Sequence, residues 1–580
     1  MRKLFAFCVL MFAPCAAWSA SAADQQARAL FEADWQWRLQ NQPEFATTVG
    51  DYRYDATLSD TSLAASRAAL QHQRTMLAQA RLIERDKLTG QDQLSYDLFV
   101  DDKERKLQAA AFYPYDPQPI TAQDGIHLNF PRLVAQMPFA TETDYRNYLA
   151  RIDALPRHID GILEQLREGM RSGWTAPKPT LRALPAMLKQ LRENLVGGQL
   201  GAPFRQIPAT IPKPVREELA AAGPAALRNK AAPALQKLED FIRTDYLPAA
   251  RESIAAGALP AGPDYYAFAV RENTTTSMTP AEIHALGLKE VARIRAEMRS
   301  VIARTGFAGS FAQFIAFANS DPRLFPARPE QLLERYRRIV ARATERLPRL
   351  FATLPAEDIG IKQSQDVGAD NQGAAYYEAA SADRPAALVV NTSRLDSRPL
   401  WETETLALHE AVPGHHLQTA RAHEIADLPN FRRYGWYVAF GEGWALYAES
   451  LGPALGFFRD PFSAFGQLNS ELLRSARLVA DTGIHALGWS RQQAIDYLNN
   501  NTANAPSDNE VEVDRYIAWP AQALGYKVGQ LRIKALKEKA QAALGDKFDV
   551  RRFHSAVIDN GPLPLSVLEQ QIERWIAQQQ

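Results

Sequence analysis

The stretch LALHEAVPGHHLQ, residues 406–418, holds three of the ten histidines of the chain. A helical His-Glu pair followed by a second histidine is typical of zinc peptidases, in which the imidazoles bind the ion and the glutamate is the general base. Two residues usually separate the glutamate from the second histidine. Here Pro413 stands where that histidine is expected, and His415 and His416 follow it. The motif predicts a zinc site with a stretched spacing, unless it is only a polar helix end.

The spacing decides which histidine can join His409 on one metal. In a regular helix His415 and His416 would lie about 9 Å and about 10.5 Å from His409 along the axis, too far to share an ion. Pro413 prevents a regular helix, because it has no N–H for the carbonyl of His409 and its ring collides with that carbonyl. A widened turn of the π-bulge kind over residues 410–414 would absorb two residues and bring His415 into position. We expect His415 as the second ligand, with His416 as the alternative.

A third ligand is expected from the stretch YVAFGEGWALYAESLG, residues 437–452. Glu442 and Glu449 are seven residues apart, so they share one face of an otherwise apolar helix. A glutamate from a following helix completes a His-His-Glu zinc site, and an unpaired buried carboxylate is costly. We expect Glu442 to bind the metal and Glu449 to support a ligand by hydrogen bonding. The alternative is that both carboxylates pair with arginines.

A polar stripe follows helical spacing in ELLRSARLVADTGIHALGWS, residues 471–490, and consists of Arg474, Arg477, Asp481 and His485. It is either a solvated face with ion pairs or a cleft wall that orients metal ligands or substrate carboxylates.

The stretch EVDRYIAWPAQALGYKVGQLRI, residues 512–533, adds Arg515, Tyr516 and Tyr526. A tyrosine hydroxyl can donate to the oxyanion that develops during peptide hydrolysis. We expect Tyr526 to take this role, with His485 or Arg515 beside it. Arg515 and Tyr516 are also the candidates for contact with the substrate.

These residues must be positioned mainly by helices. Apolar residues recur at helical spacing in several long segments, at residues 24–40, 143–170, 225–254, 278–303 and 328–351. The fourth segment opens with Thr279 as an N-cap, Pro280 in the first turn and Glu282 three residues after the cap.

Strand signals are few, and the best of them lie at residues 358–367 and 386–393, just before the histidine motif. We therefore expect a mostly α fold, a helical two-lobed clamshell with a deep cleft between its halves and a small antiparallel sheet near the active site. Residues 24–275 would form a helical scaffold half and residues 276–580 the catalytic half with the zinc site.

Residues 1–23 predict an exported protein. A basic start, a short apolar run and small residues form a secretory signal, with cleavage expected after Ala22 or Ala23. Pro14 precedes Cys15, which departs from a lipoprotein signal. We expect a soluble secreted protein, periplasmic after removal of the signal.

Composition narrows the chemistry further. Both cysteines, Cys8 and Cys15, lie in the signal, so the mature chain would bind metal only through histidine and carboxylate side chains. Basic and acidic residues balance at 66 each, which gives no sign of a nucleic-acid partner. No later apolar run reaches membrane length. Oligomeric state is not predicted.

The stretches HEAVPGHHLQ, EGWALYAES, DTGIHALGW and PAQALGYKVGQ resemble a bacterial family labelled domain of unknown function 885. That family is similar to gluzincin zinc metallopeptidases of the neurolysin and angiotensin-converting-enzyme type. The resemblance is strong over the C-terminal third. Over the rest of the chain it consists only of a similar helical pattern. Relatives vary the gap before the Gly-His pair: some read His-Glu-x-Gly-His, dipeptidyl-peptidase III-like enzymes carry one extra residue, and this chain carries two.

The resemblance implies one zinc ion held by His409, His415 and Glu442. It implies Glu410 as the catalytic base. The tyrosine-rich segment of those enzymes resembles the segment that contains Tyr526.

We expect zinc-dependent hydrolysis of peptide bonds, by an oligopeptidase or a carboxypeptidase-like enzyme. Bound zinc would polarise the scissile carbonyl and acidify a water molecule, and Glu410 would move the water proton to the leaving amine. The strand at 386–393, through Asn391 and its backbone, would pair with an extended peptide. The alternatives are a zinc amidohydrolase acting on a non-peptide amide and a periplasmic binding protein that has lost catalysis. The intact Glu410 argues against the latter, because a pure binder needs no general base.

Overall fold

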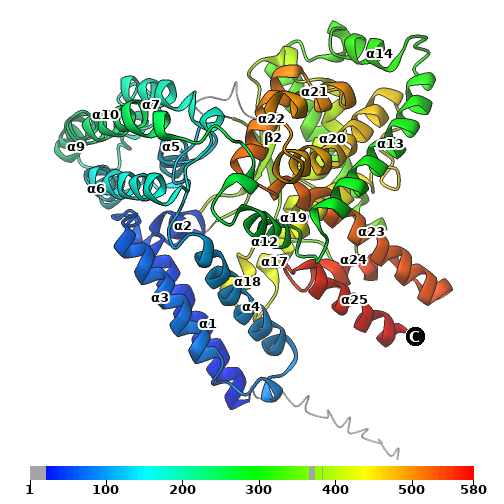
Figure 1. The fold of residues 1–580 in the computed structure, drawn as a ribbon, viewed down its shortest axis with the longest axis horizontal. Helices are drawn as coiled ribbons and strands as arrows, with labels where there is room; N and C mark the ends of the chain where they lie inside the picture. The colour runs from blue at the N-terminus through cyan, green and yellow to red at the C-terminus, as the bar shows by residue number, and fades with distance from the viewer. Residues whose placement is uncertain (1–20, 365–372, 382) are drawn as a thin grey trace, which may run out of the picture.

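The computed structural model describes residues 21–364, 373–381 and 383–580. Helices dominate and one small sheet accompanies them, so the prediction of a mostly α fold is confirmed (Figure 1). Within the described residues, no helix is long and apolar enough to cross a membrane. Most of the predicted signal lies outside the described residues, and the predicted cleavage would fall in the first turn of α1, which begins at Ala22.

The first group of helices forms a bundle at the N-terminal end of the described chain. It comprises α1 (Ala22–Asn41), α2 (Pro43–Thr48), α3 (Leu63–Ala80) and α4 (Gly90–Phe112). Ser21 and Asp24 form a reciprocal capping box that starts α1. Phe31 and Phe99 pack in the core of this bundle, and Phe431, from much later in the chain, packs against them. The bundle is therefore joined to the C-terminal half through aromatic contacts.

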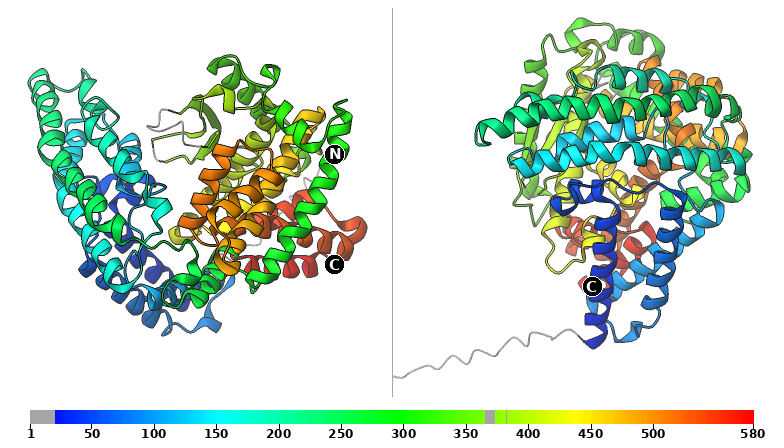
Figure 2. Two further views of the ribbon diagram at one scale, coloured as in Figure 1. Left: turned by 45° about the horizontal axis from the view of Figure 1, so that its top comes forward. Right: turned by 90° about the vertical axis from the view of Figure 1, so that its left-hand side faces the viewer.

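The second group forms a lobe with its own core. Its helices are α5 (Ile126–Gln136), α6 (Glu142–Ser172), α7 (Leu184–Glu193), α8 (Ala202–Arg205), α9 (Lys213–Ala226), α10 (Ala232–Phe241) and α11 (Leu247–Ala249). Its buried apolar residues lie between Ile120 and Ala250. Figure 2 shows this lobe adjoining the N-terminal bundle at its base and diverging from the helices of the C-terminal half, in agreement with the two-lobed shape expected from the sequence.

The segment 225–254 is helical but not regular. Five-residue turns of the π type occupy Leu227–Ala231 and Ile242–Tyr246. Each of them contains the residue four positions before a proline, Pro233 or Pro248. A proline ring collides with the carbonyl at that position and offers it no N–H, so the chain widens there.

The third group packs around two further hydrophobic cores. Its helices are α12 (Gly262–Thr274), α13 (Pro280–Arg304), α14 (Phe311–Ala318), α15 (Pro329–Arg346), α16 (Thr403–Glu410), α17 (His415–Glu424), α18 (Asn430–Arg433), α19 (Val438–Glu449), α20 (Pro461–Leu487), α21 (Arg491–Asn501), α22 (Pro506–Ala518), α23 (Gly525–Leu544), α24 (Val550–Ile558) and α25 (Leu565–Gln579). The predicted start of α13 is confirmed, since Thr279 and Glu282 form a capping box. Val270 of α12 and Ile283 of α13 share one core, although the boundary expected near residue 275 lies between them.

The sheet differs from the expectation. It has three strands, β1 (Ile359–Gln363), β2 (Ala375–Glu378) and β3 (Ala386–Val390), in the order β1-β3-β2. β3 pairs antiparallel with β2 and parallel with β1, so the sheet is mixed and not antiparallel. The reason is that β2 lies between the two expected strands in sequence and forms the antiparallel neighbour of β3. All five residues of β3 are buried, as expected for a central strand.

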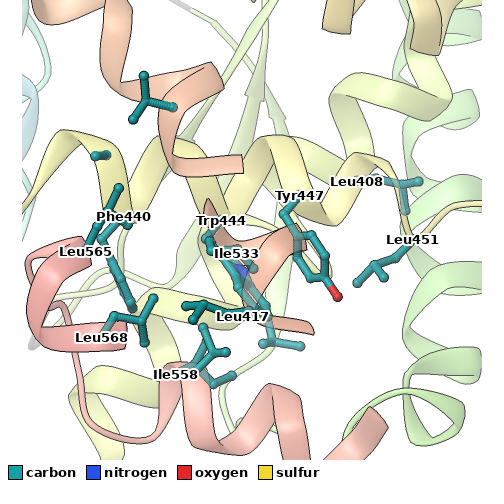
Figure 3. Packing of buried hydrophobic residues seen from close by; sticks show 14 of the residues in the cluster. Leu408, Leu417, Phe440, Trp444, Tyr447, Leu451, Ile533, Ile558, Leu565 and Leu568 are labelled. Carbon is teal, nitrogen blue, oxygen red and sulfur yellow. The ribbon is translucent and has the colours of Figure 1, made fainter. Parts of the chain in front are cut away.

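The helices that carry the histidine motif and Glu442 are held by the largest core. Leu408 of α16, Leu417 of α17 and Trp444 of α19 are fully buried in it, and Ile533 of α23 packs with them (Figure 3). α19 crosses α23 closely because both helices present glycine at the crossing. A Cβ on Gly443 would lie 2.5 Å from Cα of Gly529.

Gly443→Val should therefore lower the free energy of unfolding, since overpacking of this kind typically costs about 1–3 kcal/mol. Gly360→Val, in exposed β1, is the control, because a Cβ there meets only the carbonyl oxygen of Ala386 at 3.6 Å. Thermal unfolding followed by circular dichroism should show a lower midpoint for Gly443→Val alone. Equal midpoints in the two variants would contradict the close helix crossing.

Candidate metal centre

A cavity of about 750 Å³ lies in the C-terminal half, with all of its lining residues between Asn319 and Tyr526. His409, Glu410, His415 and Glu442 are among these lining residues. The cleft was expected between the two halves, but this cavity is formed by the C-terminal half alone. The physical reason is that β2, α16, α19, α20 and α22 already enclose it without the diverging N-terminal lobe.

The histidine motif is divided between two helices. α16 ends at Glu410 and α17 begins at His415, with a cis peptide bond between Val412 and Pro413. The chain thus breaks where a widened helical turn was expected, because the backbone leaves helical geometry at Ala411 (φ −99°, ψ −106°). One feature of a wide turn remains, since the N–H of His416 donates to the carbonyl of Ala411, five residues back, at 3.1 Å.

Gly414 allows the two helices to approach each other. A Cβ at this position would lie 1.8 Å from the carbonyl oxygen of His409, a distance that no side chain can occupy. The indole N–H of Trp444 donates to the carbonyl of Pro413 at 2.9 Å and ties the turn to α19. The turn therefore folds α17 back toward the end of α16.

Three ligand-type atoms converge as a result. Oε2 of Glu442 lies 3.6 Å from Nε2 of His409 and 3.4 Å from Nε2 of His415. The two imidazole rings are nearly perpendicular, with centroids 4.9 Å apart. A tetrahedral zinc ion with bonds of roughly 2.0–2.1 Å has ligand atoms about 3.3–3.4 Å apart. The three side chains therefore fit one ion of this kind.

Glu410 lies beside this group. Its carboxylate has an oxygen within 4.8 Å of ring nitrogens of both His409 and His415. The backbone N–H of Tyr377, in β2, donates to Oε2 of Glu410 at 2.9 Å. Glu442 is nearer to the two imidazole nitrogens than Glu410 is, so it is the better placed of the two carboxylates to share an ion with them.

The orientation of His409 depends on Glu449. Oε1 of the fully buried Glu449 lies 2.7 Å from Nδ1 of His409, as expected for a carboxylate that supports a ligand. This contact directs Nε2 toward Glu442. Burial alone would lower the pKa of His409, but hydrogen bonds that its ring donates to the carboxylates of Glu442 and Glu449 raise it to about 9. The same negative charges favour a metal cation at Nε2.

His416 points elsewhere. Its Nε2 lies 3.0 Å from the carbonyl oxygen of Glu357, and its Nδ1 lies 3.4 Å from the hydroxyl of Tyr377. Burial lowers its pKa. The structure therefore brings His415, and not His416, to His409 and Glu442.

Tyr526 and Arg515 line the same cavity. Nη2 of Arg515 donates to the hydroxyl oxygen of Tyr526 at 2.8 Å, and the guanidinium of Arg477 lies 4.5 Å from the centre of the Tyr526 ring. Because the oxygen accepts from Arg515, the hydroxyl proton of Tyr526 is available for another acceptor.

Two of the predicted site residues are structural. His485 does not line the cavity, because the N–H of Ala256 donates to its Nδ1 at 2.9 Å and its Nε2 donates to the carbonyl of Tyr516 at 2.9 Å. Burial lowers the pKa of His485 to about 4. The hydroxyl of Tyr516 is likewise buried and donates to Glu512 at 2.7 Å. The roles expected for His485 at an oxyanion and for Tyr516 at the substrate are therefore corrected.

Asn391 is also structural. Its Oδ1 accepts from the backbone N–H and the hydroxyl of Ser393, and its side-chain amide donates to the carbonyl of Gly373. It lies at the end of β3, whose two edges are occupied by β1 and β2. The expected pairing of β3 with a peptide is therefore wrong, because a central strand has no free edge.

Two features of the cavity were not expected from the sequence. β2 lines it through Ala375, Tyr376 and Tyr377, and the two adjacent tyrosines, residues that favour strands, were the one local signal for this strand. Trp436, which is 52% exposed, also lines the cavity, and its ring lies 5.8 Å from that of His415. No local pattern marks this tryptophan as a site residue.

Solved structures share this fold. One is a "putative lipoprotein" from Colwellia psychrerythraea, 27% identical, with a TM-score of 0.91 over 96% of this chain and 99% of that one. A second is a "putative lipoprotein of unknown function" from Shewanella oneidensis, 16% identical, with a TM-score of 0.67 over 95% of this chain and 99% of that one, which shows the fold alone. A search of curated proteins gave no significant match.

The family resemblance seen in the C-terminal motifs extends over nearly the whole chain. A family model matches residues 43–572, which include both lobes and the candidate metal centre. The chain belongs to the family described as bacterial protein of unknown function (DUF885).

Proposed function

We propose that this protein is a zinc-dependent peptidase in which Glu410 is the general base. The observation that carries the proposal is the convergence of His409, His415 and Glu442, in which Glu442 lies 3.4–3.6 Å from a nitrogen of each imidazole, with Glu410 beside them in a cavity. The resemblance of the motif to gluzincin metallopeptidases supports the same reaction class. Zinc, when bound, would supply a Lewis acid that polarises the scissile carbonyl and lowers the pKa of a water molecule.

The side chains of this protein would carry the proton and steady the oxyanion. Glu410, held by the N–H of Tyr377, accepts the proton of the attacking water and passes it to the leaving amine. The hydroxyl of Tyr526 donates a hydrogen bond to the oxyanion. Arg515 donates a hydrogen bond to the oxygen of the same hydroxyl and so fixes its orientation.

An extended peptide would bind along β2. The N–H of Asn391 donates to the carbonyl of Ala374, so Ala374 faces β3. The N–H and C=O groups of successive residues point to opposite edges of a strand. Those of Ala375 and Tyr377 therefore point to the edge of β2 that is away from β3. The bond from Tyr377 to Glu410 agrees with this direction and brings that edge to the metal centre. Strand addition at β2 replaces the pairing first expected at β3.

We also propose that the protein acts outside the cytoplasm. The export signal predicted at residues 1–23 supports this placement. So does the name "putative lipoprotein" given to the two similar structures, since lipoproteins are envelope proteins.

Glu410→Gln should retain one zinc per chain and lose peptidase turnover by about 10²–10⁴-fold, because it removes the base and leaves the ligands. Zinc content by elemental analysis and cleavage of a mixed peptide pool by mass spectrometry measure the two effects. Near wild-type cleavage by the variant would refute this role of Glu410. Hydrolysis of simple amides with no peptide cleavage by the wild type would favour the amidohydrolase alternative.

His415→Ala should abolish zinc retention after dialysis, because it removes one of three converging ligand atoms. His416→Ala is the matched control. The ring of His416 is hydrogen-bonded to the carbonyl of Glu357, so this variant should keep its zinc. Zinc is measured in both folded variants by elemental analysis. The reverse order of zinc loss would show that His416 is the second ligand.

Tyr526→Phe should lower the maximal rate by about 10²–10³-fold with little change in KM, as expected for the loss of one oxyanion donor. Tyr497→Phe provides the control, because this tyrosine lies on α21 away from the cavity. Steady-state kinetics on one peptide measure both variants. An unchanged rate for Tyr526→Phe would reduce Tyr526 to a packing residue.

A further inference from the structure

We propose that one wall of the cavity binds a peptide carboxylate. This arginine wall consists of Arg474 and Arg477 on α20 and Arg515 on α22, all of which line the cavity. The inference deepens the proposed peptidase function, on which it rests, by naming the substrate class as peptides that present a carboxylate to this wall.

The arginine wall has one internal counter-charge. Nε and Nη2 of Arg477 donate to the two oxygens of Glu512 at 2.9 and 3.0 Å, and Nη1 of Arg515 lies 3.6 Å from the same carboxylate. Although burial alone would raise the pKa of Glu512, Arg477 and Arg515 lower it to about 2, so it is ionised at neutral pH. A single carboxylate therefore serves two guanidinium groups.

Arg474 has no carboxylate within ion-pair distance in the described part of the chain. Its Nη1 donates to the hydroxyl and carbonyl oxygens of Ser470, at 2.7 and 3.4 Å. Three guanidinium groups are thus matched by one ion-paired carboxylate, that of Glu512, and Glu402, whose pKa Arg474 lowers, lies beyond ion-pair distance of Arg474.

Several N–H groups of the arginine wall are also unsatisfied. Nε of Arg474, Nη1 of Arg477 and Nε of Arg515 are buried and lack hydrogen-bond partners among the described residues. A charged donor buried without a partner is costly. An anion bound in the cavity beside Arg474 would offset the uncompensated positive charge, and a planar carboxylate matches guanidinium geometry.

Acidic residues of the cavity compete with this assignment. Glu402 and Asp508 line the same cavity and could attract the amino group of a peptide. Burial and the neighbouring Asp508 raise the pKa of Glu402 to about 7, so this pair does not carry a full double charge at neutral pH. Arg398 and Arg474 both lie near enough to Glu402 to lower its pKa in part, so this acid is already balanced by cations. The arginine wall therefore offers the stronger charge for binding one charged group of a peptide.

The carboxylate can be the C-terminal group of the peptide or an aspartate or glutamate side chain. Four peptides of one sequence distinguish these sources: a free acid, its C-terminal amide, its N-acetyl form, and a form with internal aspartate changed to asparagine. Binding is measured by calorimetry to zinc-loaded Glu410→Gln, which separates recognition from turnover. If the wild type cleaves no peptide, the proposed function fails, while this binding test still judges the arginine wall.

We expect removal of the recognised carboxylate to weaken binding by roughly 10–100-fold, the range for a hydrogen-bonded charged group. Loss on C-terminal amidation identifies the terminal carboxylate, and loss on the aspartate change identifies the side chain. Adding Arg474→Ala should remove that preference, Arg474→Lys should restore part of it, and Arg338→Ala, on the exposed face of α15, should keep it. Equal binding of all four peptides, or loss only on N-acetylation, would overturn the proposal.

Discussion

The reversal of the chain at Pro413 and Gly414 is the constraint on which the candidate site depends. In one continuous helix His415 would lie about 9 Å from His409 along the axis. The break after Glu410 and the missing side chain of Gly414 let α17 fold back closely. The approach is so close that a Cβ on Gly414 would collide with the carbonyl oxygen of His409. The helix break thus brings the widely spaced residues of the motif close enough together for a metal centre.

The core under the turn makes this arrangement rigid. Trp444 anchors the turn through Pro413 and is itself fully buried with Leu417. Gly443 and Gly529 permit the close crossing of α19 and α23 that positions the neighbouring Glu442. The ligand positions are therefore fixed by apolar packing as much as by polar contacts.

The cavity is electrostatically divided. At the metal centre, Glu442 and Glu449 stabilise positive charge at His409. In the arginine wall, Arg474, Arg477 and Arg515 are matched by one ion-paired carboxylate, that of Glu512. A peptide with a carbonyl at the first region and a carboxylate at the second would match both, which links the proposed chemistry to the proposed selection of substrates.

The sequence by itself determined the helical fold, the capped start of α13 at Thr279 and the residue types of the site, because helical periodicity, caps and the His-Glu motif are local signals. Pro413 also marked the segment in which the helix ends, because it has no N–H for the carbonyl of His409. The sequence could not show that β2 joins the sheet beside β3, or that His485 is held by backbone groups of Ala256 and Tyr516. Only the tertiary structure decided these points, because strand pairing and hydrogen bonding of buried side chains depend on partners distant in sequence, whereas a helix closes its hydrogen bonds within four residues.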